Sequence, residues 1–348
     1  MSLLSSHCKC WCGEVVSHSF NSDYSLCDRC GTLIYNRIGS PSDFLVNDDD
    51  ADFYGKNYWL LHQYTGLGKN DIYQRARDDL KGRNLFWLKT LLRYRLPPAR
   101  VLDLGCGHGS FVAILQQAGF DARGVEMSPW VAEFGRKTFN VDIDIGPLEN
   151  LDIAQEGLDV VVLTDVLEHF PDPMATMRCC INLLKPDGFM LIQTPQFKEG
   201  MTFEKMKEEE DRFLEMLLPD EHIYLFSPRS IALMFRQLGA DHIKFEPAIF
   251  DHYDMFLLVS RVPIISNDYA QVENRLLASP PGRMLLAMIE LYQSQLDSAR
   301  LLKECEDDRR RRIEQIETLT NQLEVSEKDR YARFVQIQTL TRLINDKE

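Results

Sequence analysis

One short stretch, residues 101–110 (VLDLGCGHGS), constrains the fold more than any other part of the sequence. An apolar run typical of a buried strand breaks there into Gly105, Gly107 and Gly109. Glycines permit a tight turn, let a ligand reach the backbone, and open a helix whose first N–H groups can bind an anion. Nicotinamide-binding chains place the third glycine one position later, where this chain has Ser110, so the spacing disfavours NAD. The stretch predicts a nucleoside-type ligand at the end of a strand.

Two acidic residues accompany this turn. Residues 122–126 predict the second strand, which ends in Glu126 about 20 residues past the glycines, the separation at which a carboxylate meets ribose hydroxyls. Asp103 lies inside the first strand, where a charge needs a partner such as a loop N–H or a ligand ammonium. Both are candidate site residues.

The motif Asp-Leu-Gly-Cys-Gly-x-Gly at residues 103–109 resembles that of the Rossmann-like, class I S-adenosylmethionine-dependent methyltransferases. The resemblance runs from about residue 85 to residue 261, through 146–149 (GPLE), 165–169 (DVLEH) and 184–188 (LKPDG). It implies an α/β fold with helices on both faces of the sheet, and transfer of a methyl group from S-adenosylmethionine.

The resemblance also implies a set of cofactor-binding residues. The glycine turn and Asp103 would hold the methionine end, Glu126 the ribose, and Leu148 with Glu149 the adenine, although a solvated helix-start carboxylate explains Glu149 equally well. Asp165 and Leu167 would line the methionine side, and His169 is assigned to helix capping or packing rather than to catalysis. The full set is Asp103, Gly105, Cys106, Gly107, Gly109, Glu126, Met127, Leu148, Glu149, Asp165 and Leu167.

The second half of this region carries the expected acceptor side. Residues 158–163 and 189–192 are continuous apolar runs, as strands buried on both faces of a parallel sheet should be, and ligands collect at their carboxyl ends. Between the second run and the next helix, residues 198–219 predict an amphipathic helix. It either caps the acceptor site or packs permanently on the core.

Residues 220–227 (DEHIYLFS) resemble the Glu-His-x-x-x-Phe-Ser element of sugar C-methyltransferases. A methyl-accepting group must lose a proton, and histidine has the ordinary pKa suited to that transfer. We therefore expect His222 as general base with Glu221 as its helper; a structural histidine near a helix start is the alternative. Some sugar enzymes have a tyrosine before this element where this chain has Pro219 and Asp220, which favours O-methylation.

Cysteines crowd the first thirty residues in the segments 7–13 (HCKCWCG) and 27–31 (CDRCG). Two thiolate clusters separated by a hairpin-sized stretch, each followed by glycine, are typical of a closed, structural zinc site. The expected ligands are Cys10, Cys12, Cys27 and Cys30; the sequence also allows Cys8 in place of Cys10 and, less directly, His7.

An N-terminal zinc-binding module joined to a methyltransferase domain through the tyrosine-rich segment 53–59 resembles the arrangement in bacterial sugar and glycan methyltransferases. Tyr54 and Tyr58 in that segment either cover the cofactor pocket or pack on the core.

Composition narrows the functional class. The formal net charge of −14 disfavours non-specific nucleic-acid binding, and the basic run 309–312 follows three acidic residues, as on a solvated helix face. Neither a membrane span nor a signal-peptide pattern is expected, and the dispersed remaining cysteines agree with a cytoplasmic chain without disulfides.

Beyond about Gly282 the sequence predicts a long helix with an imperfect coiled-coil seam of apolar residues at heptad spacing. Ile316, Leu323, Ile337 and Ile344 form one series and Leu319 and Leu340 the other, with Ser326, Arg330 and Arg333 interrupting. Such a seam would make the chain a homo-oligomer or dock another glycan-assembly protein; a partly frayed solvated helix is the alternative.

Together these patterns predict four regions: a zinc module (1–46), a linker with N-terminal helices (47–84), a methyltransferase domain (85–262) and a helical region (263–348). The first functional hypothesis is methylation of a sugar or glycan hydroxyl in polysaccharide biosynthesis. The alternatives are an acceptor of lipid, quinone or small-metabolite type, since the fold does not name its substrate, and a noncatalytic scaffold in a glycan-assembly complex.

Overall fold

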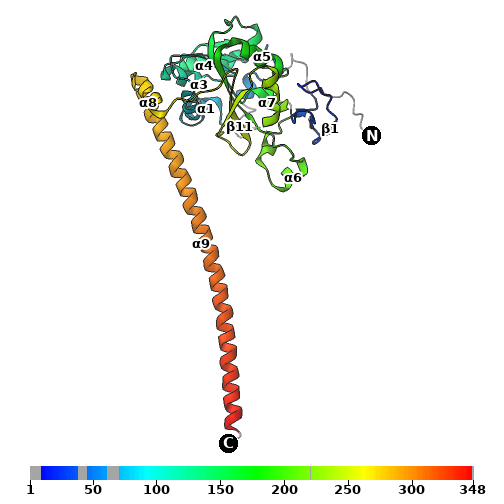
Figure 1. Ribbon diagram of the computed structural model, residues 1–348, viewed down its shortest axis with the longest axis vertical. Helices are drawn as coiled ribbons and strands as arrows, with labels where there is room; N and C mark the ends of the chain where they lie inside the picture. Colours follow the sequence, from blue (N-terminus) through cyan, green and yellow to red (C-terminus); the bar gives the residue numbers. More distant parts are fainter. Residues whose placement is uncertain (1–8, 38–44, 61–69, 220, 347–348) are drawn as a thin grey trace. The chain divides into compact units, whose positions relative to one another are not determined.

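The chain is described from a computed structural model, in which residues 9–37, 45–60, 70–219 and 221–346 are the described residues. Its centre is a seven-stranded sheet with the strand order β10-β11-β8-β7-β4-β5-β6 (Figure 1). The strands are β4 (Arg100–Leu104), β5 (Asp121–Glu126), β6 (Ile143–Ile145), β7 (Leu158–Thr164), β8 (Leu184–Pro195), β10 (His242–Glu246) and β11 (Asp254–Ser260).

The strand β4, which carries the glycine turn at its end, lies inside the sheet. Strands β5 and β6 extend from it on one side and β7 and β8 on the other, all in parallel. Beyond β8, β11 pairs antiparallel with β8, and β10 pairs antiparallel with β11. The strand order therefore reverses between β4 and β7. In open α/β sheets, ligands bind beside such a reversal, at the carboxyl ends of the strands.

Helices cover both faces of the sheet, as the sequence predicts. On one face, Met177 and Met234 pack into the same buried cluster as Leu257 of β11. Side chains alternate along a strand, so the neighbouring Phe256 points to the other face, where its ring lies 5.5 Å from that of Phe86. The helices of this part are α1 (Ile72–Lys81), α2 (Arg83–Leu92), α3 (Ser110–Ala118), α4 (Pro129–Phe139), α5 (Pro173–Leu183) and α7 (Pro228–Gln237).

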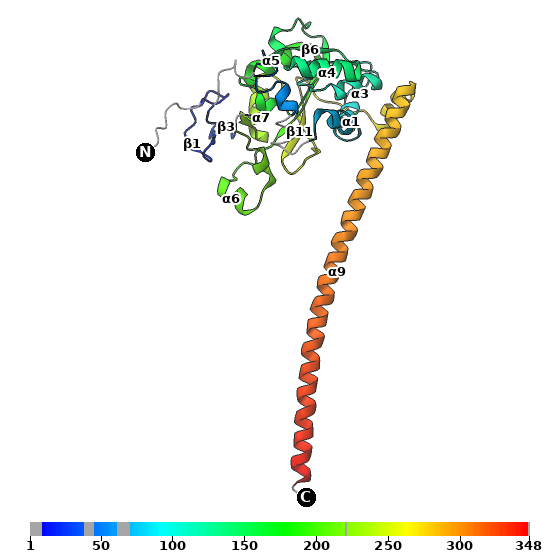
Figure 2. The same ribbon diagram turned by 180° about the vertical axis from the view of Figure 1, so that it is seen from behind.

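A second, four-stranded sheet joins the cysteine-rich N-terminal segment to the rest of the chain. Its order is β1-β2-β3-β9, and every pairing in it is antiparallel. In both views the blue N-terminal strands lie beside the green α7, about 200 residues later in the chain (Figures 1 and 2). The strands are β1 (His18–Ser19), β2 (Tyr24–Leu26), β3 (Leu33–Tyr35) and β9 (Tyr224–Leu225).

The expectation of one amphipathic helix over residues 198–219 is wrong. The segment forms a short helix α6 (Phe203–Glu208) and a 3-10 helix η5 (Arg212–Met216). Glu210 adopts a left-handed φ of +51°, which ends α6, and the Asp211 carboxylate accepts a hydrogen bond from the first turn of η5. Met206 and Phe213 are fully buried, so both pieces pack on the core.

The chain divides into two compact units, residues 1–289 and 290–348. After α8 (Tyr269–Leu277), helix α9 (Pro280–Asn345) runs from the first unit through the second. Its buried residues, Gly282, Leu285, Leu286 and Ile289, belong to the first unit. Among the described helices, none has an apolar stretch that would cross a lipid bilayer.

Candidate cofactor and acceptor site

The glycine turn after β4 has the left-handed backbone that its residue type permits. Gly105, Gly107 and Gly109 have φ values of +72°, +53° and +74°. The backbone N–H groups of Gly105 and Cys106 donate to the carbonyl of Val125 in β5, which anchors the turn. A Cβ added at Gly107 would lie 2.7 Å from the Trp59 ring, so a side chain cannot be accommodated there without movement.

Gly109 has a separate role. It is the N-cap of α3, and a Cβ added there would lie 2.9 Å from Ile143 of β6. Its missing side chain therefore lets α3 start tightly against the sheet rather than against a ligand.

Glu126 ends β5 and is 7% exposed. Its carboxylate accepts hydrogen bonds from the backbone N–H groups of Gly107, Met127 and Ser128 at 2.9, 2.9 and 3.0 Å. Burial raises the pKa of Glu126, and the three N–H donors oppose that rise. The carboxylate thus joins the glycine turn to the start of α4.

Asp103 is buried in β4 close to Glu126. Desolvation by burial, with a smaller contribution from the Glu126 charge, raises the pKa of Asp103 to about 8. A carboxyl group in such a position favours a neighbouring cation, because a positive charge stabilises its ionised form.

A cavity of about 1060 Å³ brings most of the predicted residues together. Gly109 and Leu167 are not part of its lining; Leu167 is fully buried in the hydrophobic core, and its neighbours Val166 and Glu168 line the cavity instead. The predicted residues in the lining are Asp103, Gly105, Cys106, Gly107, Glu126, Met127, Leu148, Glu149, Asp165, Glu221 and His222.

Leu148 and Glu149 lie in a short 3-10 helix, η3 (Leu148–Asn150). Leu148 is buried, whereas Glu149 is exposed and accepts a hydrogen bond of 2.6 Å from the Thr176 hydroxyl of α5. Glu149 therefore has a structural partner and also lines the cavity, which agrees with both a solvated helix-start carboxylate and an adenine contact.

Asp165 follows β7 with a left-handed φ of +58°. Its carboxylate accepts hydrogen bonds from Arg83 and, at 2.9 Å, from Gln193, whose other amide atom accepts from Trp87 at 3.0 Å. Arg83 is a cavity residue that the sequence analysis missed, since a lone arginine in a helix before the glycine motif carries no spacing signal.

The expected base, His222, is 7% exposed and lines the cavity. Its Nδ1 lies 2.7 Å from the backbone carbonyl oxygen of Met216. A carbonyl oxygen can only accept, so Nδ1 carries a proton; in the neutral ring, Nε2 then has the lone pair that a proton acceptor requires. The carboxylate of the adjacent Glu221 accepts a hydrogen bond of 3.2 Å from the Tyr58 hydroxyl.

His169, which the sequence analysis assigned to capping or packing, lies beside His222. The two ring centroids are 5.0 Å apart. The Nδ1 of His169 is 2.8 Å from the carbonyl oxygen of Glu221 and 3.0 Å from the Tyr54 hydroxyl. The motif at residues 165–169 was the available signal, but it does not show which of its side chains face His222.

Glu168 is a further cavity residue that the sequence alone did not identify. It is 1% exposed, its carboxylate accepts a hydrogen bond of 2.8 Å from Thr194, and burial raises its pKa well above the ordinary value. One polar atom each from Glu168, His169 and His222 lies within 4.8 Å of the other two. The cavity therefore contains a compact group of titratable side chains.

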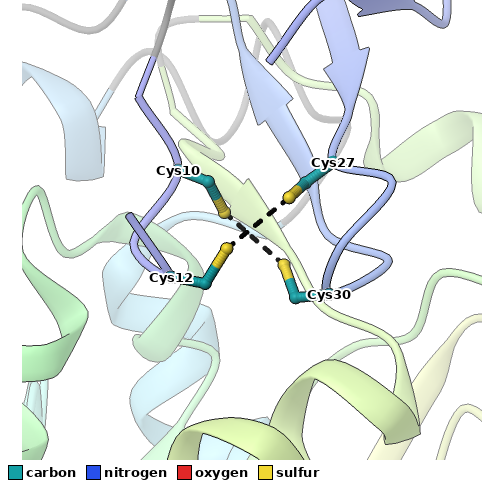
Figure 3. Close-up of side chains that lie close together, drawn as sticks. All are labelled: Cys10, Cys12, Cys27 and Cys30. Carbon is teal, nitrogen blue, oxygen red and sulfur yellow. Dashed lines mark hydrogen bonds between the residues drawn. The ribbon is translucent and has the colours of Figure 1, made fainter. Parts of the chain in front are cut away.

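The four expected metal ligands converge from two loops (Figure 3). The Sγ atoms of Cys10 and Cys30 are 3.5 Å apart, those of Cys12 and Cys27 are 3.6 Å apart, and all four lie within 4.8 Å of one another. A tetrahedral zinc with bonds of about 2.3 Å needs sulfur separations of about 3.8 Å, so the geometry fits such an ion.

Two glycines shape these loops. Gly13 donates its N–H to the Cys10 carbonyl and Gly31 to the Cys27 carbonyl, both at 2.8 Å and with positive φ. The other candidates, Cys8 and His7, lie outside the described residues, as does Asp220.

Residues 74–244, just under half of the chain, match the family model described as a methyltransferase domain. The chain is also similar to proteins named ubiquinone biosynthesis O-methyltransferase. Identity is 35% over 108 residues for the protein of Xanthomonas campestris pv. campestris (strain B100) and 34% for that of Xanthomonas oryzae pv. oryzae (strain PXO99A). Each alignment covers 29% of this chain and 45% of the relative, so the chain spans under half the length of these curated relatives.

Among solved structures, similarity extends to magnesium protoporphyrin IX methyltransferase from Synechocystis PCC 6803, solved with bound SAH, at 18% identity and a TM-score of 0.42. That match covers 60% of this chain and 98% of the other. A protein from Pyrococcus horikoshii OT3 has the same identity and TM-score and is covered to 99%.

Proposed function

We propose that this chain, which carries a class I S-adenosylmethionine-dependent methyltransferase domain, moves a methyl group from that cofactor to a hydroxyl of a sugar or glycan. One observation carries the proposal. A single cavity is lined both by the glycine turn with Glu126 and by His222 with Glu221. A cofactor and an acceptor bound there would share one cavity and could be aligned for a transfer between them.

The residues of the turn fit the cofactor. Gly105 and Gly107 line the cavity with backbone alone, and the Glu126 carboxylate, oriented by three N–H donors, suits ribose hydroxyls. Asp103 provides a buried carboxyl for the cationic methionine end. When bound, S-adenosylmethionine supplies a methyl group made electrophilic by its sulfonium.

The acceptor side needs alignment and removal of one proton. His222 accepts the hydroxyl proton at Nε2, because Nδ1–H is held by the Met216 carbonyl. Glu221 assists indirectly: its backbone carbonyl orients the His169 ring, and its carboxylate binds the Tyr58 hydroxyl at the cavity wall. This set of polar side chains supports a hydroxylic acceptor.

The proposal is tested by calorimetry with S-adenosylmethionine, followed by assays of S-adenosylhomocysteine release with candidate sugar nucleotides and glycans. Glu126→Ala should weaken cofactor binding, whereas His222→Ala should leave it within about twofold and slow turnover by roughly 10²- to 10⁴-fold. His242→Ala, at an exposed position of β10, is the matched control and should behave like the wild type.

Two results would contradict this assignment. Full turnover in His222→Ala would remove the base, and absence of any binding heat in the wild type would remove the cofactor. The second result would leave the noncatalytic scaffold as the better account.

A quinone-related or other small hydroxylated acceptor is the second candidate. The observation that favours it is the name of the relatives above, ubiquinone biosynthesis O-methyltransferase. Phenolic and lipid-linked hydroxyl compounds therefore belong in the same assay panel, and turnover confined to them would replace the sugar or glycan acceptor.

We also propose that Cys10, Cys12, Cys27 and Cys30 hold one structural zinc ion. Four thiolates would fill a tetrahedral ion and leave no position for a substrate. Metal analysis of the purified chain should find about one zinc per chain. Cys27→Ser should lose that zinc, whereas Cys305→Ser, which changes an exposed cysteine on α9, should retain it. Equal zinc content in both variants would contradict the ligand set.

A further inference from the structure

We infer that Tyr24 is a positioning residue for His222, and that the cysteine module of residues 9–37 holds the acceptor side of the cavity in its working geometry. The inference rests on the proposed function, because it takes His222 as the proton acceptor. It gives the N-terminal module a role in the transfer without placing any of its residues in the cavity.

The backbone of the module is paired directly with the segment that follows His222. Strand β3 pairs with β9 in the register Leu33 to Leu225 and Ile34 to Tyr224. The ladder continues toward the histidine, since the Tyr35 N–H donates to the Ile223 carbonyl at 2.9 Å. These bonds fix the path of the chain up to the residue next to His222.

Tyr24 reaches His222 itself. Its side chain is fully buried, and its hydroxyl donates a hydrogen bond of 3.0 Å to the His222 backbone carbonyl. A buried carbonyl needs a partner, and loss of this donor removes a hydrogen bond from the backbone of the proposed base. Tyr24 therefore fixes the peptide that carries the imidazole.

The imidazole ring is held through the same module. Its Nδ1–H donates to the Met216 carbonyl, and Met216 packs against the buried cluster formed by Phe20, Tyr24 and Leu33 of the module with Phe213 of η5. Two contacts of His222, one at its backbone and one at its ring, thus involve the N-terminal strands.

The cysteine loops set the geometry of those strands. Cys27 directly follows β2, and its N–H donates at 2.9 Å to the carbonyl of Thr32, which directly precedes β3. The Thr32 hydroxyl lies 3.2 Å from the Cys30 sulfur. The loop that carries Cys27 and Cys30 is therefore the turn between β2 and β3, and an ion bound there would fix their register.

The glycine turn and Glu126 are supported by other elements. Their hydrogen bonds run between β4, β5 and the start of α4. Disturbing the module should therefore change His222 and spare cofactor binding.

The test uses the full chain with 15N-labelled histidine and reads the tautomer of His222 by NMR. Its signal is assigned by its loss in His222→Gln. In the wild type we expect one Nδ1–H form. Tyr24→Phe, which deletes only a hydroxyl, should give a mixture of tautomers or a broadened signal, while the dissociation constant for S-adenosylmethionine stays within twofold.

Tyr94→Phe is the matched control. It deletes another buried tyrosine hydroxyl, one that donates to Glu246 of β10, and should leave the His222 signal unchanged. If Tyr24→Phe does not fold, removal of metal from the wild type by a chelator replaces it and should produce the same change.

An unchanged His222 signal after the perturbation would overturn the inference. This outcome is independent of the proposed function, which fails instead if the wild type does not bind the cofactor or if His222→Ala retains full turnover.

Discussion

At the scale of single residues, two buried carboxyl groups in the same site are held in different ways. Glu126 is surrounded by three backbone N–H donors, whereas burial and the Glu126 charge raise the pKa of Asp103 to about 8. Asp103 is therefore largely protonated at neutral pH before a ligand binds. A cation beside it would favour ionisation, so binding of a cationic cofactor should release a proton.

The affinity for S-adenosylmethionine should consequently depend on pH. Below the pKa of Asp103, cofactor binding must displace a proton from this carboxyl group. Each unit by which the pH is lowered should therefore weaken the affinity by up to about tenfold. Between about pH 6.5 and pH 8.5 we expect the dissociation constant to fall by roughly one order of magnitude. Calorimetry in two buffers of different ionisation enthalpy would measure both the affinity and the released proton.

Asp103→Asn is the control, because an amide keeps the shape of the side chain and cannot titrate. Only the titration of the cofactor itself should remain in that variant. An identical pH dependence in wild type and variant would show that Asp103 is not the titrating group.

Residue identity was predictable from the sequence where a motif dictates backbone geometry. Gly105 and Gly107 and the carboxylate of Glu126 lie together as their spacing predicts. The placement of Glu168 and His169 was not predictable in this way, because a 3-10 turn, η4 (Leu167–His169), decides which of three consecutive side chains enters the core. That choice puts Leu167 in the core and the other two at the cavity.

At the scale of elements, the connection from β4 to α3 combines two demands on glycine. Gly109 has no room for a side chain, because an added Cβ would lie 2.9 Å from Ile143. It also adopts a left-handed φ of +74°. Gly200 has a similar φ of +81° but nothing within 4 Å of an added Cβ. Gly200 thus has only the left-handed backbone, whereas Gly109 has both the left-handed backbone and the crowding, so comparing alanine variants at the two positions separates the two effects.

Gly109→Ala should therefore destabilise the chain more than Gly200→Ala. Left-handed backbone alone costs a non-glycine residue about 1–2 kcal/mol, and overpacking against Ile143 should add roughly 1–3 kcal/mol. Urea unfolding of the two variants measures the difference. Equal losses of stability would mean that α3 and β6 adjust to the extra methyl group.

Elements differ in how far their sequence determines them. The buried parallel strands β4 and β7 are recognisable from continuous apolar runs. The two-residue strand β9 is not, because its pairing with β3 joins segments about 190 residues apart and leaves no local pattern. The break between α6 and η5 lets both pieces bury a side chain, Met206 from α6 and Phe213 from η5. The helical periodicity over 198–219 does not reveal this break.

At the scale of the whole molecule, the part of helix α9 beyond Ile289 leaves large apolar residues exposed within the described chain. Ile316, Leu319 and Leu323 are 62%, 63% and 62% exposed, and Ile337 and Leu340 are similarly open. Most helices in proteins are stabilised by packing of an apolar face rather than by propensity. The heptad spacing of these residues therefore supports pairing with another helix.

We propose a second copy of this chain as the partner and expect a dimer by light scattering at micromolar concentration. Replacing both Ile316 and Leu323 with Asp should shift the mass from about twice to once that of the 40.3 kDa chain, because two desolvated charges would enter the seam. Thr318→Asp together with Asn321→Asp adds the same charges outside the heptad seam and should leave the dimer intact. Loss of the dimer in both double variants would indicate general charge repulsion rather than a specific helix–helix seam. A monomeric wild type would contradict self-association and favour a different protein as the partner of α9.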